Sequence, residues 1–277
     1  MRLKIEKEDY NTIVSLYQSG LSLEKIGKVY GVNKSSIKTV LNKMNIKTRD
    51  NSHKGRKYTI NENYFDNIDT PNKAYILGLL YSDGCNYRKA NHVKLELQES
   101  DKEILEKIKR EMNINNPLKL NELSKKNTNW QNTYRLSIVN KHVSETLESL
   151  GVIPNKSLKI VFPKWLPDEL LPHFLRGYVD GDGHIQCYVS RHVSLVGTEN
   201  FCLTVKEKLK NIGIKSTISN TQNKETSTRI LYICGIANIT NFLDYIYDSA
   251  ELYIDRKYNA YKTFLKETNN TNNSLSA

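Results

Sequence analysis

Two aspartates near the middle of the chain have the residue type and the setting of a metal site. Asp83 and Asp182 lie 99 residues apart (182 − 83), and each ends a largely apolar run and precedes a glycine. An acid at the C-terminus of an apolar helix is unfavourable without a cation, because the helix dipole and a neighbouring carboxylate both oppose its charge. Mg²⁺ binds one or two carboxylates together with water and phosphate oxygens. The two acids therefore predict metal-assisted hydrolysis of a phosphodiester.

Glycines at matching places predict that the two apolar runs form packed helices. Gly78 and Gly177 are equivalent in this internal repeat, and Gly181 lies four residues after Gly177 on the same helix face. Small residues at such places let two helix backbones approach closely. We therefore expect a helix interface through these three glycines, which brings Asp83 and Asp182 together. The alternative is two buried helix ends whose acids only cap or form ion pairs.

The two segments resemble the paired motifs of single-chain LAGLIDADG homing endonucleases. They read ILGLLYSDG at 76–84 and LRGYVDGDG at 175–183, and the resemblance covers roughly residues 70–266. The first segment departs at Tyr81, where the motif has Asp, but the family's metal-binding residue is the eighth, which is Asp in both segments. The resemblance implies a Mg²⁺-dependent enzyme that cuts both DNA strands across the minor groove and leaves 3′ overhangs.

The resemblance also implies supporting residues around the metals. Ser82 and Gly181, which precede the two acids, are expected at the metal site. The family has a polar residue that orders water around the metals, for which Asp101 and Glu199 are the candidates. It also has a lysine beside the scissile phosphate, for which Lys141 is the nearest match. The alternative for this stretch is simple helix capping, in which Ser100 or Thr198 caps the helix that follows and the acid lies in its first turn.

The charge balance favours a polyanionic partner. The 277 residues include 41 Lys and Arg against 30 Asp and Glu, a net charge of +11. Residues 1–57 hold 13 of the basic and 5 of the acidic residues, so they carry +8 of this excess (13 − 5). Double-stranded DNA is the expected partner, and RNA is the alternative polyanion.

The remaining composition excludes several classes of protein. The four cysteines form no CxxC or Cys/His cluster, which argues against a structural zinc site or a disulfide framework. The N-terminus lacks an apolar signal region, and no apolar run approaches the length of a membrane span. We therefore expect a soluble, cytoplasmic protein without a membrane partner, in a bacterial or phage-type setting.

Residues 1–46 resemble the helix-turn-helix of many bacterial DNA-binding proteins. Gly27 permits close helix contact, and Gly31 supplies the tight turn before a recognition helix that starts at Asn33 or Lys34. The expected small core consists of Ile26, Val32, Ile37 and Val40. The residues expected to contact bases or phosphates in a major groove are Lys34, Ser35, Ser36, Lys38, Thr39, Asn42 and Lys43. The alternative is a three-helix bundle with a solvated basic face.

Each of the two repeats is expected to present a polar sheet face to DNA. In residues 92–98, Val93, Leu95 and Leu97 alternate with charged and polar residues, which predicts a strand with one buried face. The polar faces of the two repeats would together form a saddle for a duplex groove. The predicted contacts are Asn86, Arg88, Lys94, Gln98, Arg135 and Ser137 in the first repeat and Gln186, Tyr188, Ser190, His192, Ser194 and Arg229 in the second. For any one of them, ordinary solvent exposure is the alternative.

The expected fold class is α+β. Two pseudo-twofold-related αββαββα repeats form the saddle, and a small all-α helix-turn-helix domain precedes them. The predicted segments are the helix-turn-helix domain at 1–46, a basic linker at 47–69, the first repeat at 70–150, a connector at 151–167, the second repeat at 168–266 and a disordered tail at 267–277. The linker either touches DNA or is only solvated. Arg256 and Lys257 are expected to contact phosphate.

The function predicted from these features is that of a homing endonuclease, a monomeric enzyme that cuts double-stranded DNA at a long asymmetric site. Two alternatives remain at this point. One is a transcription regulator that keeps the fold and has lost the chemistry, which the two intact acids oppose. The other is an RNA-binding intron maturase, which the helix-turn-helix opposes because it suits a B-form major groove better than an A-form one.

Overall fold

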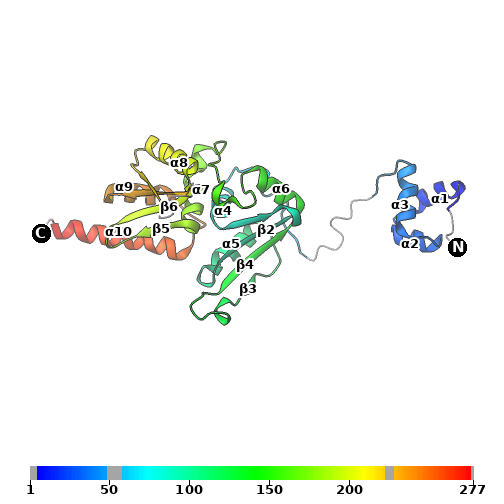
Figure 1. Ribbon diagram of the computed structural model, residues 1–277, viewed down its shortest axis with the longest axis horizontal. Helices are drawn as coiled ribbons and strands as arrows, with labels where there is room; N and C mark the ends of the chain where they lie inside the picture. The colour runs from blue at the N-terminus through cyan, green and yellow to red at the C-terminus, as the bar shows by residue number, and fades with distance from the viewer. Residues whose placement is uncertain (1–4, 49–57, 222–227, 276–277) are drawn as a thin grey trace. The chain divides into compact units, whose positions relative to one another are not determined.

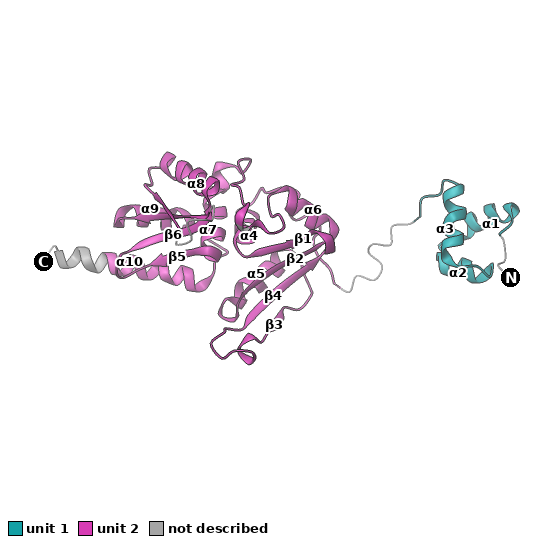
Figure 2. Cartoon of the chain, viewed as in Figure 1, with its two compact units in different colours: residues 1–57 teal, residues 58–277 magenta. Residues whose placement is uncertain are grey.

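The computed structural model describes residues 5–48, 58–221 and 228–275, and the chain divides into two compact units (Figures 1 and 2). Unit 1 spans residues 1–57 and unit 2 spans residues 58–277. Each unit has its own hydrophobic core. Among the described residues, no helix is both apolar enough and long enough to span a bilayer.

Unit 1 contains three helices, and the turn between the second and third lies where the sequence predicted a helix-turn-helix. Its helices are α1 (Tyr10–Gln18), α2 (Leu23–Val29) and α3 (Lys34–Lys43). Ile26, Ile37 and Val40 are buried at its centre, and Val32 packs against them. The predicted core is therefore confirmed.

The turn between α2 and α3 depends on the two predicted glycines. Gly31 has φ +63°, a left-handed conformation that other residues adopt only with strain. A Cβ on Gly27 would lie 2.6 Å from the carbonyl oxygen of Val32, so only glycine fits at this contact. Asn33 then caps α3, since its side-chain oxygen accepts from the backbone N–H of Ser36 at 3.0 Å.

Unit 2 contains the two predicted repeats. The first comprises α4 (Pro71–Ser82), β1 (Gly84–Tyr87), β2 (His92–Gln98), α5 (Lys102–Glu111), β3 (Lys119–Asn121), β4 (Thr133–Val139) and α6 (Lys141–Ser149). The second comprises α7 (Leu171–Asp182), β5 (Gly183–Gln186), β6 (His192–Thr198), α8 (Glu199–Asn211), β7 (Thr217–Asn220), β8 (Thr228–Cys234) and α9 (Ile236–Tyr247). A further helix, α10 (Asp255–Leu275), follows. The αββαββα order is thus confirmed.

Each repeat folds into a four-stranded antiparallel sheet. The strand orders are β1-β2-β4-β3 and β5-β6-β8-β7, which are equivalent. Along β2, burial alternates as expected: Val93, Leu95 and Leu97 are buried, and the residues between them are not. Helices α5 and α8 pack on the buried faces, and α4 and α7 lie side by side between the two sheets (Figure 1).

The contact between α4 and α7 depends on the predicted glycines. A Cβ on Gly78 would lie 2.0 Å from the carbonyl oxygen of Phe174, and a Cβ on Gly177 would lie 2.0 Å from that of Tyr75. The helix backbones therefore touch without an intervening side chain. Because both helices end together, this contact fixes the positions of the acids at their C-terminal ends.

Two predicted segment boundaries are wrong. Residues 58–69, assigned to the linker, belong to unit 2, because Tyr64 and Phe65 are buried in its core. Residues 49–57 of that linker lie outside the described residues. The tail predicted to be disordered is helical as far as Leu275, since the sequence from Asp255 contains no Gly or Pro to end α10 and Phe264 anchors the helix in the core.

Candidate active site

Asp83 and Asp182 stand at the adjoining C-terminal ends of α4 and α7. Asp83 is the residue after the last turn of α4, and Asp182 is the last residue of α7. Gly181 makes their approach possible, because a Cβ there would lie 2.5 Å from Oδ2 of Asp83 and 2.0 Å from Oγ of Ser82. The prediction that the glycine-mediated interface brings the two acids together is confirmed.

Both acids are held in surroundings that oppose their charge. Burial, followed by the negative charge of Asp182, raises the pKa of Asp83 to about 6. Asp182 is exposed to solvent, yet the protein packed beneath it also raises its pKa above that of an ordinary aspartate. Burial is the larger cause at Asp83, and repulsion by Asp182 is the second. A bound cation would relieve both effects.

Two buried lysines that the sequence analysis did not assign to the metal site flank the acids. Nζ of Lys156 donates to the carbonyl oxygen of Ser82, and Nζ of Lys257 donates to that of Gly183. Their charges lower the pKa of both acids, while burial lowers the pKa of each lysine. A signal was present in the sequence: Lys156 follows Asp83 by 73 residues (156 − 83), and Lys257 follows Asp182 by 75 (257 − 182).

Asp101 lies beside this centre but does not cap α5. Its side chain is only 2% exposed and forms an ion pair with Arg256, whose Nε lies 2.9 Å and 3.1 Å from the two carboxylate oxygens. The positive charge of Arg256 lowers the pKa of Asp83, so the ion pair lies near that acid. The side chain of Asp101 therefore makes no capping hydrogen bond to α5 and instead positions a cation.

Glu199 differs from Asp101. It forms an ion pair with Arg229 at 3.2 Å, and the capping of α8 is performed by Thr198, whose Oγ1 accepts from the backbone N–H of Phe201. Neither contact involves the two motif acids. A role for Glu199 in ordering water at the metals stays a prediction.

A buried carboxylate network anchors α7 beneath the acids. Asp180, which is fully buried, accepts hydrogen bonds from the hydroxyls of Tyr75 and Tyr247 at 2.8 Å and 2.6 Å. It also accepts from the backbone N–H of Ile254 at 2.8 Å. Asp180 holds the sixth place of its motif, where the first motif has Tyr81, whose hydroxyl donates to the carbonyl oxygen of Leu150. Both residues therefore fix the motif helices to neighbouring segments.

The donor set fits Mg²⁺. Among the described residues, no group of three or more His, Cys, Asp and Glu side chains could enclose a metal ion. The two motif acids thus offer two carboxylates, and the backbone carbonyl of Gly181 precedes Asp182, whereas the carbonyl oxygen of Ser82 already accepts from Lys156. Mg²⁺ commonly binds one or two carboxylates and completes its octahedral shell with water and substrate phosphate. The role of Ser82 and Gly181 at the metals stays a prediction.

Four predicted contact residues lie on the outer face of the first sheet. Lys94 and Ser137 are paired across β2 and β4, and Arg135 is paired with Glu96 in the same ladder. Arg135 also forms an ion pair with Glu96 at 2.7 Å. Gln98 is exposed at the end of β2. These side chains remain candidates for contact with DNA.

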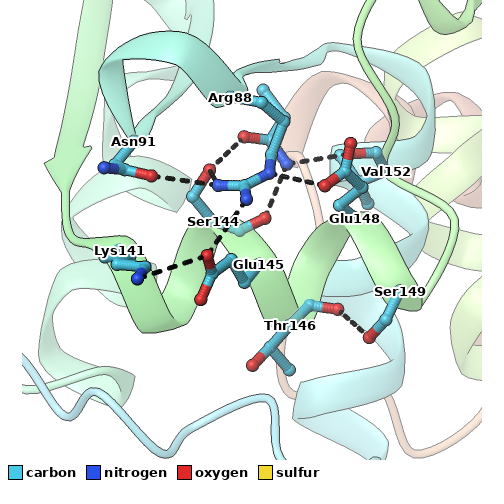
Figure 3. Close-up of polar contacts among 10 residues, drawn as sticks. Arg88, Asn91, Lys141, Ser144, Glu145, Thr146, Glu148, Ser149 and Val152 are labelled. Carbon is cyan, nitrogen blue, oxygen red and sulfur yellow. Dashed lines mark hydrogen bonds and ion pairs between the residues drawn. The ribbon is translucent and has the colours of Figure 1, made fainter.

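Asn86 and Arg88 do not belong to this face, which corrects two predicted contacts. Asn86 is 2% exposed, and its Nδ2 donates to the carbonyl oxygens of Ser144 and Val152, because its position in β1 points to the helix side of the sheet. Arg88 is occupied by Glu148 at 2.5 Å and Glu145 at 3.2 Å (Figure 3). Both residues therefore attach α6 to the sheet.

Lys141 is not one of the lysines that flank the two motif acids. It begins α6, its side chain is 73% exposed, and it forms an ion pair with Glu145 at 3.8 Å (Figure 3). The basic residues whose charges lower the pKa of Asp83 are Lys156, Arg256 and Lys257. We looked for this lysine directly after the last strand of the repeat, β4, where Lys141 lies. The buried lysine of the first repeat, Lys156, comes later, after the last helix, α6.

The second sheet presents a different outer face. Gln186, His192 and Ser194 lie on it as predicted, and exposed His184, which was not predicted, lies opposite Ser194 in the register. Tyr188 is exposed in the loop between β5 and β6. The carbonyl oxygen of Ser190, in the same loop, contacts the ring of His192 at 2.6 Å. All of these residues remain candidates.

Arg229 is a further correction. In β8 it shares the orientation of the buried residues Leu231 and Ile233, because strand side chains alternate between faces. Its guanidinium pairs with Glu199 at the start of α8. It therefore lies on the helix side of the second sheet and not on its outer face.

The recognition helix of unit 1 presents the predicted residues to solvent. Ser36 is partly buried, and Lys34, Ser35, Lys38, Thr39, Asn42 and Lys43 are exposed. The hydroxyls of Ser35 and Ser36 both donate to Oδ1 of Asn33, at 2.6 Å and 3.1 Å, so these two serines support the cap. The four residues Lys34, Lys38, Asn42 and Lys43 offer the donors that a major groove accepts.

The raised pKa of Asp83 predicts how stability depends on pH without metal. Because the folded-state pKa is about 6 and that of an unfolded aspartate is about 4, the fold favours the protonated acid. Ionisation of Asp83 should therefore cost the metal-free protein stability as the pH rises from about 4 to about 6, while His173, whose pKa is lowered to about 4, acts in the opposite sense. Asp83→Asn should remove part of this pH-dependent loss of stability. Asp180, whose pKa is also raised to about 6, should still contribute to the loss in that variant.

Melting temperatures measured in EDTA across this pH range check the prediction. The control is Asp168→Asn, which replaces an exposed acid before the opposite end of α7. An identical pH dependence in wild type and Asp83→Asn would show that the Asp83 carboxylate is not held against its charge.

Comparison with known proteins agrees with the repeated architecture. The family model of the LAGLIDADG-like domain matches residues 70–151 and, a second time, residues 169–247. An uncharacterized protein of Methanocaldococcus jannaschii is 27% identical over 145 residues, which are 49% of this chain and 53% of the relative. The chain thus spans about half the length of this curated relative.

Two solved structures illustrate the similarity to known folds. Full-length DUF199/WhiA from Thermatoga maritima has a TM-score of 0.48 and 17% identity, and the match covers 78% of this chain and 70% of that one. The homing endonuclease I-DmoI in complex with DNA and Ca has a TM-score of 0.43 and 16% identity, with 70% and 93% covered.

Proposed function

The chain belongs to the LAGLIDADG-like domain family, and from this membership we propose that it is a site-specific, Mg²⁺-dependent endonuclease of double-stranded DNA. The observation that carries the proposal is the pair of motif acids, Asp83 and Asp182, at touching helix ends with a buried lysine beside each. A protein that only binds DNA has no use for carboxylates held against their charge close to a polyanion. One chain supplies both acids, so we expect the enzyme to act as a monomer.

The proposed reaction is hydrolysis of one phosphodiester in each strand. In each strand a water oxygen forms a bond to phosphorus, the bond from phosphorus to one sugar oxygen breaks, and that sugar oxygen takes up a proton in place of the proton that the water loses. Mg²⁺ held by the two acids would activate the water and stabilise the attacking and leaving oxygens.

The protein's own residues position the DNA for this chemistry. Asp83 and Asp182 hold their carboxylates at the helix ends, where the contact between α4 and α7 fixes their separation. Lys156 and Lys257 supply positive charge that offsets the charge building up on the phosphates. The outer faces of the two sheets would contact the duplex on either side of the cut.

A DNA-binding regulator without nuclease activity is the second candidate, because the helix-turn-helix of unit 1 would supply its DNA recognition without any chemistry. The exposed face of α3 can serve either protein, because major-groove contacts by a recognition helix give specificity and not chemistry. The same helix disfavours an RNA maturase, since the deep major groove of A-form RNA does not admit it.

Incubation of the full chain with a library of long duplexes and Mg²⁺, followed by sequencing of new ends, tests the proposal. We expect ends at one enriched sequence, in both strands, with 3′ overhangs. Enrichment of bound duplexes that all remain uncut would favour the regulator instead.

Deletion of residues 1–57 should weaken DNA binding and preserve cleavage. The deletion follows the boundary between the two units and removes a charge of +8. The slope of log affinity against log salt should become shallower by about 0.9 for each phosphate that the shortened protein no longer neutralises. The footprint should shorten on one flank only, because a single helix-turn-helix accompanies a pseudo-symmetric core.

Footprinting and salt titration of both proteins on one duplex measure this effect. An unchanged footprint and slope would assign unit 1 a role in protein interaction or folding, and DNA recognition would then rest on unit 2 alone.

A further inference from the structure

The outer faces of the two sheets can be compared position by position, because the strand registers of the two repeats are equivalent. In both sheets the glycine after the motif acid pairs with a leucine, Leu95 or Leu195. Each of these leucines pairs in turn with a leucine of the next strand, Leu136 or Leu231. The rows of side chains on either side of these leucines therefore correspond one to one.

The row that follows these leucines on the outer face differs in charge between the two sheets. In the first sheet this row consists of Glu96, Arg135 and Lys119. In the second sheet the same row consists of Val196, Ile230 and Ser219. Three charged side chains in one repeat thus correspond to two apolar side chains and a hydroxyl in the other.

The row that precedes these leucines shows the same difference. Lys94 lies opposite Ser137 in the first sheet, whereas Ser194 lies opposite Tyr232 in the second. The four strands of the second sheet, all of which the structure describes, place no Lys, Arg, Asp or Glu on the outer face. The first outer face carries three basic residues and one acid, a net charge of +2 (3 − 1).

Glu96 holds Arg135 in place on the first face. Nε and Nη2 of the arginine both lie 2.7 Å from Oε2 of Glu96, whose Oε1 accepts hydrogen bonds from Asn121 and Thr133. Among the contacts described for Arg135, none uses Nη1, and 26% of the side chain is exposed. A guanidinium fixed in this way suits the two acceptors that guanine presents in a major groove.

Val196 and Ile230 form an apolar pair within the otherwise polar outer face of the second sheet. They lie directly opposite each other across β6 and β8, and Val196 is 40% exposed. Val196 is one residue beyond Leu195, which pairs with Gly183 directly after Asp182, so the pair borders the candidate active site. Apolar side chains read the C5-methyl group of thymine in a major groove, and no acid on this face opposes a polyanion.

We propose that the two sheets read different bases close to the cut: Arg135 on the first sheet binds guanine, and Val196 and Ile230 on the second contact the methyl groups of thymine. This inference rests on the proposed function, because it assumes that the outer faces contact DNA. Since the two rows correspond in the register, guanine and thymine would occupy corresponding places in the two half-sites. The target would then be asymmetric although the fold that reads it is repeated.

The test is a base-analogue scan of the site recovered from the duplex library, whether by cleavage or by binding. Each thymine is replaced in turn by uracil, which lacks only the methyl group, and each guanine by 7-deazaguanine, which lacks the N7 acceptor. Affinity of the full chain is measured in EDTA at pH 8, where an ordinary histidine is neutral. Uracil should weaken binding about four-fold at thymines of one half-site, as loss of one buried methyl group predicts. 7-Deazaguanine should weaken binding about five-fold or more in the other half-site.

Two double variants assign these effects to residues. V196A/I230A should bind the thymine and uracil duplexes equally and keep its response to 7-deazaguanine. E96Q/R135Q, which removes both charges of the ion pair, should lose the response to 7-deazaguanine and keep the response to uracil.

Matched controls separate these effects from general damage. Val139→Ala truncates an exposed valine on the outer face of the first sheet and should keep the response to uracil. Arg110→Gln removes an exposed arginine of α5, which packs on the opposite face, and should keep both responses.

A transplanted row tests base reading in a way that a purely structural role would not reproduce. V196E/I230R gives the second sheet the pair that the first sheet has at the same place in the register. In a library randomised at the uracil-sensitive positions, this variant should select guanine where wild type selects thymine.

Three results would each overturn the inference: a wild type that tolerates uracil at every thymine, a response to uracil that persists in V196A/I230A, or a response to 7-deazaguanine that persists in E96Q/R135Q. Because the scan measures binding without metal, duplexes that are bound but never cut would overturn the proposed nuclease activity and leave this test intact.

Discussion

Asp83→Asn and Asp182→Asn should each lower double-strand cleavage by more than about 100-fold while DNA affinity in EDTA stays the same or rises. Mutation of residues that only support a metal ligand typically costs about 10- to 100-fold in activity or metal affinity, so loss of a ligand charge should cost more. DNA binding should persist because each substitution keeps the shape of the side chain and removes negative charge near the phosphates of the DNA. Single-turnover cleavage and a binding titration on the same duplex measure the two effects.

The matched control for both variants is Asp168→Asn before the far end of α7, which should cut at the wild-type rate. Mg²⁺ should also raise the melting temperature of wild type more than that of either variant, a readout independent of cleavage. Wild-type cleavage rates in both motif variants would contradict the assignment of the metal site. Equal loss of binding and cleavage would point instead to a disturbed helix interface.

Gly177→Ala should destabilise unit 2 by about 3 kcal/mol or more. Its new Cβ would lie 2.0 Å from the carbonyl oxygen of Tyr75 and 2.8 Å from the backbone nitrogen of Leu79, so α4 and α7 must move apart. Overpacking typically costs about 1–3 kcal/mol, and backbone atoms have the least freedom to yield. The melting temperature should fall on the order of 10 °C. Cleavage should fall as well, because the same contact sets the separation of the acids.

Gly197→Ala provides the comparison for this prediction. A Cβ there would lie 2.9 Å from a ring carbon of Phe201 and 3.3 Å from the hydroxyl of Tyr178, and both are side chains that can shift. Its effect on the melting temperature, measured by thermal unfolding, should be clearly smaller. A Gly177→Ala protein as stable as wild type would mean that the helix backbones do not meet at this residue.

Local patterns in the sequence predicted the parts of the fold that repeat or alternate. The two nine-residue motifs predicted the helix pair and its acids, and alternation in residues 92–98 predicted a half-buried strand. Each of these signals is formed by residues that are close together in the sequence. The helix-turn-helix was predicted for the same reason, since Gly27 and Gly31 act through contacts at short range.

The features that the sequence did not predict depend on contacts between residues that are far apart in the chain. Asn86 and Arg88 are polar and looked exposed, yet their partners are on α6, more than 50 residues away. Lys156 and Lys257 reach the site from segments 74 residues beyond the groups they bond. Arg229 was placed on the wrong sheet face, because residues 228–234 (TRILYIC) do not alternate between polar and apolar residues and so do not show which face is buried.

The most direct test of the central claim is the addition of Mg²⁺ to a metal-free complex of the wild-type protein with its recovered site. We expect both strands to be cut within the preformed complex, and complexes of Asp83→Asn and Asp182→Asn, formed with equal affinity, to stay uncut over the same time. A wild-type complex that remains intact in Mg²⁺ at every pH between 6 and 9 would contradict the proposed metal site and make the protein a DNA-binding member of the family without nuclease activity.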